Sequence, residues 1–316
     1  MTPFHGNAPA RAAFDAAMAS GALHHAWLLA GPQGVGKGRF AREAAARLLA
    51  QSANDANGER TRALLEAGSH PDYRELVRLA KEERGETRVA RSITIAQVRS
   101  LQSLFATTPS LGPRRVIVID AIDDLEREGA NALLKSLEEP PPGTVFLLVS
   151  HAPGRLLPTI RSRCRTLRFG LLGEADVREV LCEQAPSLRG EELEILVRAA
   201  AGSPGRALRY VGLDLGVIDT ALTLIARTGD RGNAERAKLA KALSTKAAQP
   251  RYEAFLDRAP EFIAQQAPHR AGDELRAALD AYEEAQLIAG AARRLSLDAG
   301  GTVFELAGVV ARLARM

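Results

Sequence analysis

The sequence is poor in cysteine, and this scarcity excludes two kinds of protein. Only Cys164 and Cys182 occur among the 316 residues. A disulfide framework or a four-cysteine zinc site needs more thiols than two. We therefore expect a protein of a reducing compartment.

Long apolar runs and aromatic side chains are scarce as well. No run approaches the roughly 20 apolar residues that cross a bilayer, and the start MTPFHGNAPARAAFDAAM lacks the charged-then-apolar order of a secretory signal. Aromatic residues make up 4% of the chain, and neither a base-stacking platform nor a recognition-helix or zinc-finger signature appears. These absences predict a cytoplasmic protein with no membrane contact and weigh against a stand-alone nucleic-acid-binding module.

Lysine is rare although the chain is basic. The net charge is +4 and the isoelectric point is near 9.3, yet 36 arginines stand beside only 6 lysines. A chain rich in arginine and alanine more often reflects a GC-rich genome than a nucleic-acid surface. The positive charge therefore carries little weight as evidence of direct DNA contact.

The order of apolar patterns predicts an α/β domain followed by helices. Short apolar runs alternate with helical patterns up to residue 169, as expected for a parallel sheet covered on both faces, with VIVID (116–120) and VFLLVS (145–150) as central strands. Residues 171–209 hold two short helical patterns closed by GSPG, the size of a small three-helix lid. Residues 210–316 are helical almost throughout, and residues 51–60 are predicted to form a polar loop.

The stretch GPQGVGKGRF (31–40) has the spacing of a phosphate-binding loop. Gly31, Gly34 and Gly36 would let backbone N–H groups converge on phosphates, and Lys37 would reach the terminal phosphates. An apolar strand precedes the stretch and a helical pattern follows it. We interpret it as a phosphate loop by descent, although Gly38 stands where serine or threonine should hold magnesium.

A second part of a nucleotide site is suggested by RRVIVIDAIDD (114–124). Asp120 ends a predicted buried strand, where ATPases of this architecture place a metal-binding aspartate followed by a glutamate that activates water. Ala121 cannot activate water. Asp120 could also be a plain strand-end cap, but we favour a vestigial nucleotide site.

One long passage resembles a known family. ANALLKSLEEPPPGTVFLLVSHAPGRLLPTIRSRCRTLRF (130–169), with HPDYREL (70–76) and AAGSPGRAL (200–208), resembles the clamp-loader ATPases of bacterial DNA polymerase III, members of the AAA+ superfamily, and among them the delta-prime subunits. The resemblance covers roughly the first 210 residues. It implies an AAA+ domain with a RecA-like sheet over 1–170, a helical lid over 171–209 and an all-α collar or oligomerisation domain over 210–316.

Within this passage the residues themselves also predict a helix. ANALLKSLEE places Leu133, Leu134 and Leu137 on one face, which would meet the sheet, and three prolines halt the helix.

The triplet Ser162-Arg163-Cys164 matches a motif of that family. There the arginine reaches the nucleotide bound by the neighbouring subunit, and Arg163 holds the matching position. A surface arginine in a salt bridge is the alternative, since Arg161 and Arg165 lie close by. The resemblance implies that Arg163 is an arginine finger acting in trans.

The departures from the family pattern concern hydrolysis. Motor subunits carry serine or threonine at Gly38, glutamate at Ala121 and arginine at Gly205, while Arg206 comes one position late to serve as a nucleotide sensor. The chain thus resembles a non-hydrolysing stator, with an ATP-hydrolysing motor-type subunit as the alternative. The vestigial or weak site would comprise the following residues: Gly31, Gly34, Gly36, Lys37, Gly38 and Asp120.

The resemblance also implies cofactors and partners. Weak binding of ATP or ADP without hydrolysis stays open, and no metal is expected: residues 51–69, where many relatives insert a four-cysteine zinc module, contain no cysteine. The implied partners are ATPase subunits of the gamma/tau type and a delta subunit, and through the complex the sliding clamp and primed DNA. The chain would then be a subunit of a DNA-directed DNA polymerase holoenzyme in chromosome replication.

Two features of the helical part complete the expectations. Cys182 is predicted to lie in the core, on an apolar helix face. A stripe at helical spacing, which would mediate assembly or form internal core, comprises Leu275, Leu279, Tyr282, Gln286 and Ala289.

Overall fold

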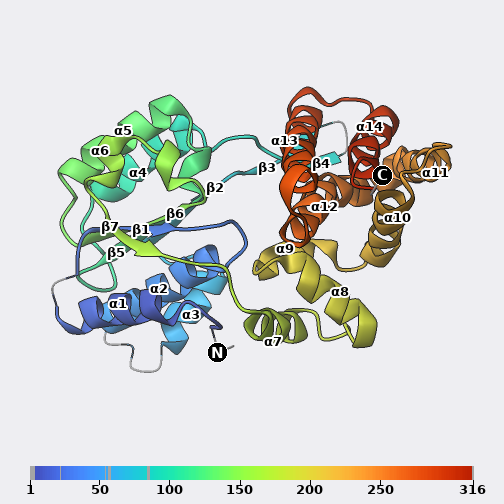
Figure 1. The fold of residues 1–316 in the computed structure, drawn as a ribbon. Helices are drawn as coiled ribbons and strands as arrows, with labels where there is room; N and C mark the ends of the chain where they lie inside the picture. The colour runs from blue at the N-terminus through green and yellow to red at the C-terminus, as the bar shows by residue number, and fades with distance from the viewer. Residues whose placement is uncertain (1–3, 22, 54, 56–57, 84–85, 315–316) are drawn as a thin grey trace. The chain divides into compact units, whose positions relative to one another are not determined.

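The computed structural model describes the chain except residues 1–3, 22, 54, 56–57, 84–85 and 315–316 (Figure 1). It divides into two compact units. The first contains Met1–Glu179 and Gly202–Gly205, and the second contains Val180–Ala201 and Arg206–Met316. Within the described residues, no helix combines the length and apolar character needed to cross a membrane. The boundaries predicted between an α/β domain, a lid and a collar, at residues 170 and 209, remain predictions.

The first unit is built on a five-stranded parallel sheet. Its strand order is β2-β5-β6-β1-β7. The strands are β1 (Ala26–Ala30), β2 (Tyr73–Val77), β5 (Arg115–Asp120), β6 (Thr144–Ser150) and β7 (Arg165–Arg168). The prediction that VIVID and VFLLVS form central strands is confirmed, because β5 and β6 are interior and buried along nearly their whole length.

Helices cover both faces of this sheet, as Figure 1 shows. The helices α1 (Ala8–Ala19), α2 (Lys37–Ser52) and α3 (Glu59–Glu66) lie on one side, and α4 (Ile95–Phe105), α5 (Arg127–Glu138) and α6 (Pro158–Arg161) on the other. Alternate strand residues supply the two cores, since successive side chains of a strand point to opposite faces. Leu28 and Ile117 belong to the α4–α5 side. Trp27 packs its ring 5.1 Å from that of Phe14 in α1.

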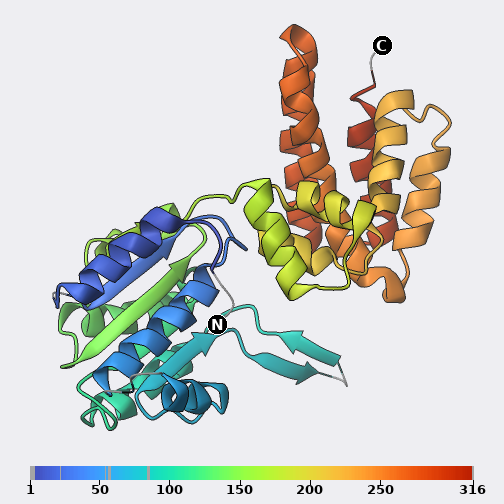
Figure 2. The same cartoon turned by 90° about the horizontal axis from the view of Figure 1, so that it is seen from below.

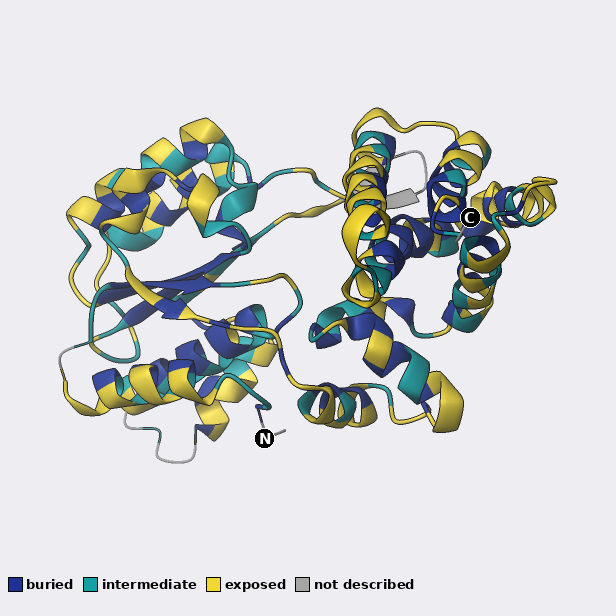
Figure 3. Ribbon diagram, viewed as in Figure 1, coloured by how far each residue is buried: buried dark blue, intermediate teal, exposed yellow. Residues whose placement is uncertain are grey.

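Helix α5 follows the sequence prediction closely. Leu133 and Leu137 are buried against the sheet, and Leu134 packs partly buried beside them. The helix ends at Glu138, just before three prolines that cannot continue it. Figure 3 shows the resulting pattern of dark blue strands between helices with yellow outer faces.

Four elements of the first unit were not predicted. Helices α1 and α3 were missed, and β3 (Ala80–Glu83) and β4 (Glu86–Val89) form an antiparallel hairpin that projects from the main sheet (Figure 2). The hairpin sequence AKEERGETRV has no alternation of apolar residues, so the sequence pattern gave no sign of strands there. In the predicted loop 51–60, α2 runs to Ser52 and α3 begins at Glu59, while residues 54 and 56–57 lie outside the described residues.

The described residues after β7 are helical or in turns, as predicted. The helices are α7 (Glu174–Gln184), α8 (Gly190–Ala200), α9 (Pro204–Tyr210), α10 (Leu215–Thr228), α11 (Ala234–Leu243), α12 (Gln249–Gln266), α13 (Gly272–Leu295) and α14 (Ala299–Ala311). In the second unit, α14 is the central helix and packs against α10, α11, α12 and α13.

Two expectations about helical faces are corrected. Cys182 is exposed, because its neighbour Leu181 takes the buried side of α7. The buried face of α13 is made of small residues, namely Ala278, Ala281, Ala285, Ala289 and Ala292. The predicted stripe is therefore only partly core, and Leu279 remains 50% exposed.

Candidate functional site

The phosphate loop connects β1 to α2 at the carboxyl edge of the sheet. Gly34 and Gly36 have φ angles of 82° and 96°, which side chains other than glycine rarely allow. Helix α2 begins directly at Lys37. The strand, loop and helix are thus arranged as the sequence predicted.

Lys37 binds the loop that carries it. Its ammonium group is buried and donates hydrogen bonds to the carbonyl oxygens of Gly31 at 2.7 Å and Pro32 at 2.5 Å. Burial lowers the Lys37 pKa to about 8, although Asp120 and Asp123 partly oppose this shift. The lysine is therefore engaged within its own loop, where its charge is poorly solvated.

We expect stability to depend on pH through Lys37. Between the folded pKa of about 8 and the ordinary lysine pKa of 10.5, the unfolded chain keeps a proton that the folded chain has lost. Stability contributed by this group therefore rises with pH in that window. Urea denaturation at pH 7.5 and pH 10 should show the wild type gaining about 2 kcal/mol more than Lys37→Met. Parallel pH profiles for the two proteins would contradict the buried-ammonium assignment.

Gly38 leaves room for the carboxylate of Asp120. A Cβ atom at position 38 would lie 2.2 Å from Asp120 Oδ2. Asp120 contacts Arg42 at 3.4 Å, and Arg42 Nε donates to Glu75 Oε1 at 2.8 Å. Burial raises the pKa of Asp120, and the charge of Arg42 opposes this shift. The position expected to carry a hydroxyl is thus in contact with the strand-end aspartate.

Asp123 joins the ends of two central strands. Its carboxylate accepts hydrogen bonds from the Ser150 hydroxyl at 3.0 Å and from the backbone N–H groups of His151 and Ala152 at 2.6 and 3.1 Å. Burial lowers the pKa of His151, and the charge of Lys37 adds to this effect. Ala121 is buried and, as the sequence indicates, offers no group that could activate water.

Sequence reasoning missed four residues of this edge: Arg42, Glu75, Asp123 and His151. Signals for three of them were present. Ligand-binding residues of parallel sheets gather beyond the carboxyl ends of strands, where Asp123 and His151 follow β5 and β6. Arg42 lies one helical turn after Gly38 and so shares its side of α2.

The start of α9 and Ser203 just before it pack directly on the phosphate loop. The Gly205 N–H donates to the Gly34 carbonyl oxygen at 2.9 Å. The Ser203 hydroxyl donates to the Gln33 carbonyl oxygen at 2.7 Å. A Cβ atom at Gly205 would lie 2.8 Å from the Gly34 Cα. Arg206, the next residue, pairs with Glu261 at 2.8 Å within the second unit.

Arg163 lies at the opposite edge of the sheet from the phosphate loop. In the register of β7 with β1, Arg165 pairs with Trp27 and Arg168 with Ala30. Arg163 precedes β7 and so lies at the amino edge, whereas the phosphate loop follows Ala30 at the carboxyl edge. Strands of this length span roughly 15 Å. The structure therefore does not bring the predicted finger and the predicted nucleotide loop together.

The guanidinium of Arg163 is fixed on two sides. Its Nη2 forms an ion pair with Glu138 Oε1 at 2.5 Å, and its Nη1 donates to the Thr159 carbonyl oxygen at 2.7 Å. Thr159 also accepts a hydrogen bond from the Ser162 hydroxyl at 3.1 Å. Burial raises the pKa of Cys164 to about 12, so this residue is a protonated thiol. The salt bridge foreseen as an alternative role of Arg163 is present, and about a third of its side chain stays exposed.

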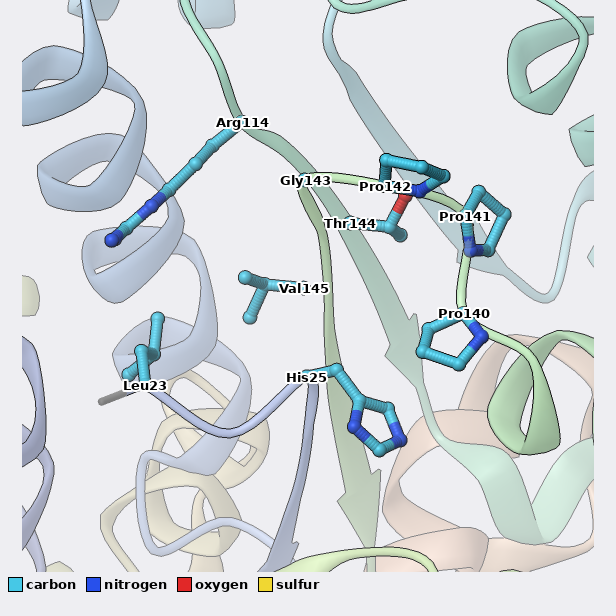
Figure 4. A pocket seen from close by; sticks show the side chains of 9 residues that line it. All are labelled: Leu23, His25, Arg114, Pro140, Pro141, Pro142, Gly143, Thr144 and Val145. Carbon is cyan, nitrogen blue, oxygen red and sulfur yellow. The ribbon is translucent and has the colours of Figure 1, made fainter. Parts of the chain in front are cut away.

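A pocket of about 240 Å³ also opens at the amino edge. Its lining is drawn in Figure 4 and consists of Leu23, His25, Arg114 and residues 140–145. Three consecutive prolines form one wall, and the side chain of Arg114 points away from them. None of the phosphate-loop residues lines this pocket.

Comparisons with known proteins agree with these observations. A family described as "DNA polymerase III, delta subunit" matches residues 6–172, which is more than half of the chain. The delta' subunit of DNA polymerase III from Pseudomonas aeruginosa is 44% identical over 191 residues, covering 60% of this chain and 56% of that relative. The chain belongs to the DNA polymerase III delta-prime family.

Other relatives of this delta-prime family member have the names of other DNA polymerase III subunits. The gamma/tau subunit of DNA polymerase III from Mycobacterium tuberculosis is 30% identical over 256 residues, covering 77% of this chain and 41% of that protein. The chain thus matches about half the length of these curated relatives.

Solved structures with a similar fold include one that aligns with nearly the whole chain. A DNA polymerase III gamma subunit-related protein of Thermotoga maritima has a TM-score of 0.43 and 16% identity, covering 92% of this chain and 95% of that one. Family membership and the parallel sheet together confirm the predicted fold class, an AAA+ α/β domain followed by helices.

Proposed function

We propose that this delta-prime family member is a non-hydrolysing subunit of the DNA polymerase III clamp loader. It would assemble with ATPase subunits that load the sliding clamp onto primed DNA, and it would donate Arg163 to a nucleotide bound by a neighbour. The observation that carries the proposal is the place of Arg163, which lies at the edge of the sheet opposite its own phosphate loop. An arginine in that place lies away from the phosphate loop of its own chain, so any nucleotide it contacts would be bound by a neighbour.

The condition of the phosphate loop supports the non-hydrolysing part of the proposal. Lys37 is bonded to loop carbonyls, and the strand-end Asp120 is in contact with Gly38. Gly205 stands where motor subunits carry an arginine, and it packs on the loop backbone. These contacts weigh against the motor-type alternative.

The names of the relatives support the choice of partners. Subunits called delta', gamma, tau and gamma/tau of DNA polymerase III occur among the similar proteins. We propose gamma/tau-type ATPase subunits and a delta subunit as direct partners in the cytoplasm, and the sliding clamp and primed DNA as ligands of the whole complex. Residues 1–170, 171–209 and 210–316 would be its AAA+, lid and collar domains.

Capture of the chain from its native cell tests the assembly. A tagged chromosomal copy should co-purify with the other DNA polymerase III subunits in fixed ratio, as identified by mass spectrometry. A chain that purified alone, or only with unrelated proteins, would contradict the proposal.

We expect the isolated protein to show no ATPase activity above background, with or without primed DNA. Neither a hydroxyl at Gly38 nor a carboxylate at Ala121 is available to position magnesium and water. The measurement is phosphate release by the purified chain, with a gamma/tau-type subunit as the positive control. Turnover near 1 s⁻¹, which lies in the ordinary enzyme range, would favour the motor-type alternative.

A further inference from the structure

Two carboxylates of adjacent strands meet one guanidinium beside the phosphate loop. Glu75 lies in β2 and Asp120 ends β5, and their side chains are only 22% and 21% exposed. Arg42 of α2 contacts both, with its Nε 2.8 Å from Glu75 Oε1 and its Nη2 3.4 Å from Asp120 Oδ2. The Tyr73 hydroxyl donates to the other oxygen of Glu75 at 3.1 Å. Arg42 therefore connects α2 to two strands.

In phosphate loops that bind nucleotide, a metal ion occupies the position beside the strand-end aspartate. There a serine or threonine hydroxyl and a strand-end aspartate hold Mg²⁺ together. Here the Asp120 carboxylate lies where a side chain at position 38 would begin, 2.2 Å from the Cβ position. Arg42 Nη1 lies 3.4 Å from that same point. The residues present do not fit a magnesium ion, because the hydroxyl is missing and a guanidinium stands beside the aspartate.

We infer that the Arg42 guanidinium replaces the divalent cation of a working phosphate loop. The positive charge that holds Asp120 against the start of α2 comes from the chain itself. The loop therefore keeps its form without nucleotide or metal, and Gly38 is needed to admit the Asp120 carboxylate. This inference concerns the isolated chain and does not depend on its assembly into a clamp loader.

The charges around the cluster explain why Arg42 is needed. Burial and the neighbouring Glu75 both raise the pKa of Asp120, while Arg42, Lys37 and Arg78 oppose this shift. Removing Arg42 would leave two carboxylates, each mostly buried, beside each other. Carboxylate pairs of this kind are compensated either by a basic side chain or by a hard divalent cation.

Thermal unfolding of Arg42→Ala in EDTA and in MgCl₂ tests this inference. In EDTA, Arg42→Ala should unfold at a lower temperature than the wild type. About 10 mM MgCl₂ should then raise its Tm by roughly 2–4 °C and leave the wild-type Tm unchanged. Arg42→Lys, which keeps a cation, should not respond to magnesium. If Arg42→Ala does not fold, Arg42→Gln is measured in its place by the same criterion.

Arg47→Ala is the matched control. Arg47 lies in the same helix and forms an ion pair at 2.6 Å with Asp15 of α1, which is not part of the Glu75–Asp120 cluster. Its removal should give no magnesium response, and Arg42→Ala combined with Asp120→Asn should lose the response. The inference is overturned if magnesium fails to stabilise the Arg42 variant, or if it stabilises the wild type or Arg47→Ala equally.

Discussion

Arg163→Ala should slow ATP hydrolysis by the assembled clamp loader while the variant subunit stays folded and incorporated. An arginine finger that stabilises transition-state charge in trans is worth about 10³–10⁵ in rate at the site it serves. Only one partner site of several would lose it, so clamp loading by the complex should fall in part. The ion pair with Glu138 is half-exposed, and its loss should cost about 0.5 kcal/mol of stability or less.

Arg161→Ala is the control for this experiment. Arg161 is also exposed in α6, and its guanidinium donates to the Pro153 carbonyl oxygen at 3.4 Å. The variant therefore removes the same charge two residues away while Arg163 keeps its contacts to Glu138 and Thr159. Steady-state ATPase and clamp-loading assays on reconstituted complexes compare the two variants. Equal defects would mean that local charge matters and that no specific finger exists.

Charging the exposed side of α13 should abolish or strongly weaken assembly. Leu279 and Leu287 are 50% and 70% exposed in this helix, whose opposite side is buried through alanines. An isolated chain that exposes two leucines on its longest helix has apolar surface available for partner subunits. The double variant Leu279→Lys/Leu287→Lys should bind its partners at least about tenfold more weakly in analytical gel filtration or calorimetry.

Val217→Lys provides the comparison for the α13 variant. Val217 is 58% exposed in α10 and has the same apolar character. It should keep full affinity, and circular dichroism should show unchanged helix content in both proteins. Equal losses would contradict a specific role of α13. Cutting the chain near Leu208 is a poorer experiment, because α8 belongs to the same compact unit as the C-terminal helices.

Patterns that the chain repeats along a strand or helix could be predicted from the sequence. The runs VIVID and VFLLVS are apolar at nearly every position, which occurs when both faces of a strand are buried, and they form the interior strands β5 and β6. Leu133 and Leu137 share one helical face and are buried as expected. The phosphate loop could be placed because it lies between an apolar strand pattern and a helical pattern, whereas Arg163 was chosen from the family motif Ser162-Arg163-Cys164.

Features that depend on contacts across the fold could not be predicted. The sequence places Arg42 on the Gly38 side of α2, but its role follows from Glu75 and Asp120, which are 33 and 78 residues away. The hairpin β3–β4 carries no apolar pattern, since it lies outside the main sheet. Cys182 was misplaced because a helix as short as α7 leaves its buried side poorly defined by the sequence.

The contact between Gly205 and Gly34 bears on how this subunit type can evolve. A side chain at position 205 meets main-chain atoms of the loop, 2.8 Å from Cα and 3.0 Å from the carbonyl oxygen. Main-chain atoms cannot rotate aside, so an arginine at position 205 would force the loop or the start of α9 to move. For the proposed non-hydrolysing subunit, a path to ATP hydrolysis through this position would therefore begin with a loss of stability. The division of labour between such a subunit and its neighbours is thus easier to acquire than to reverse.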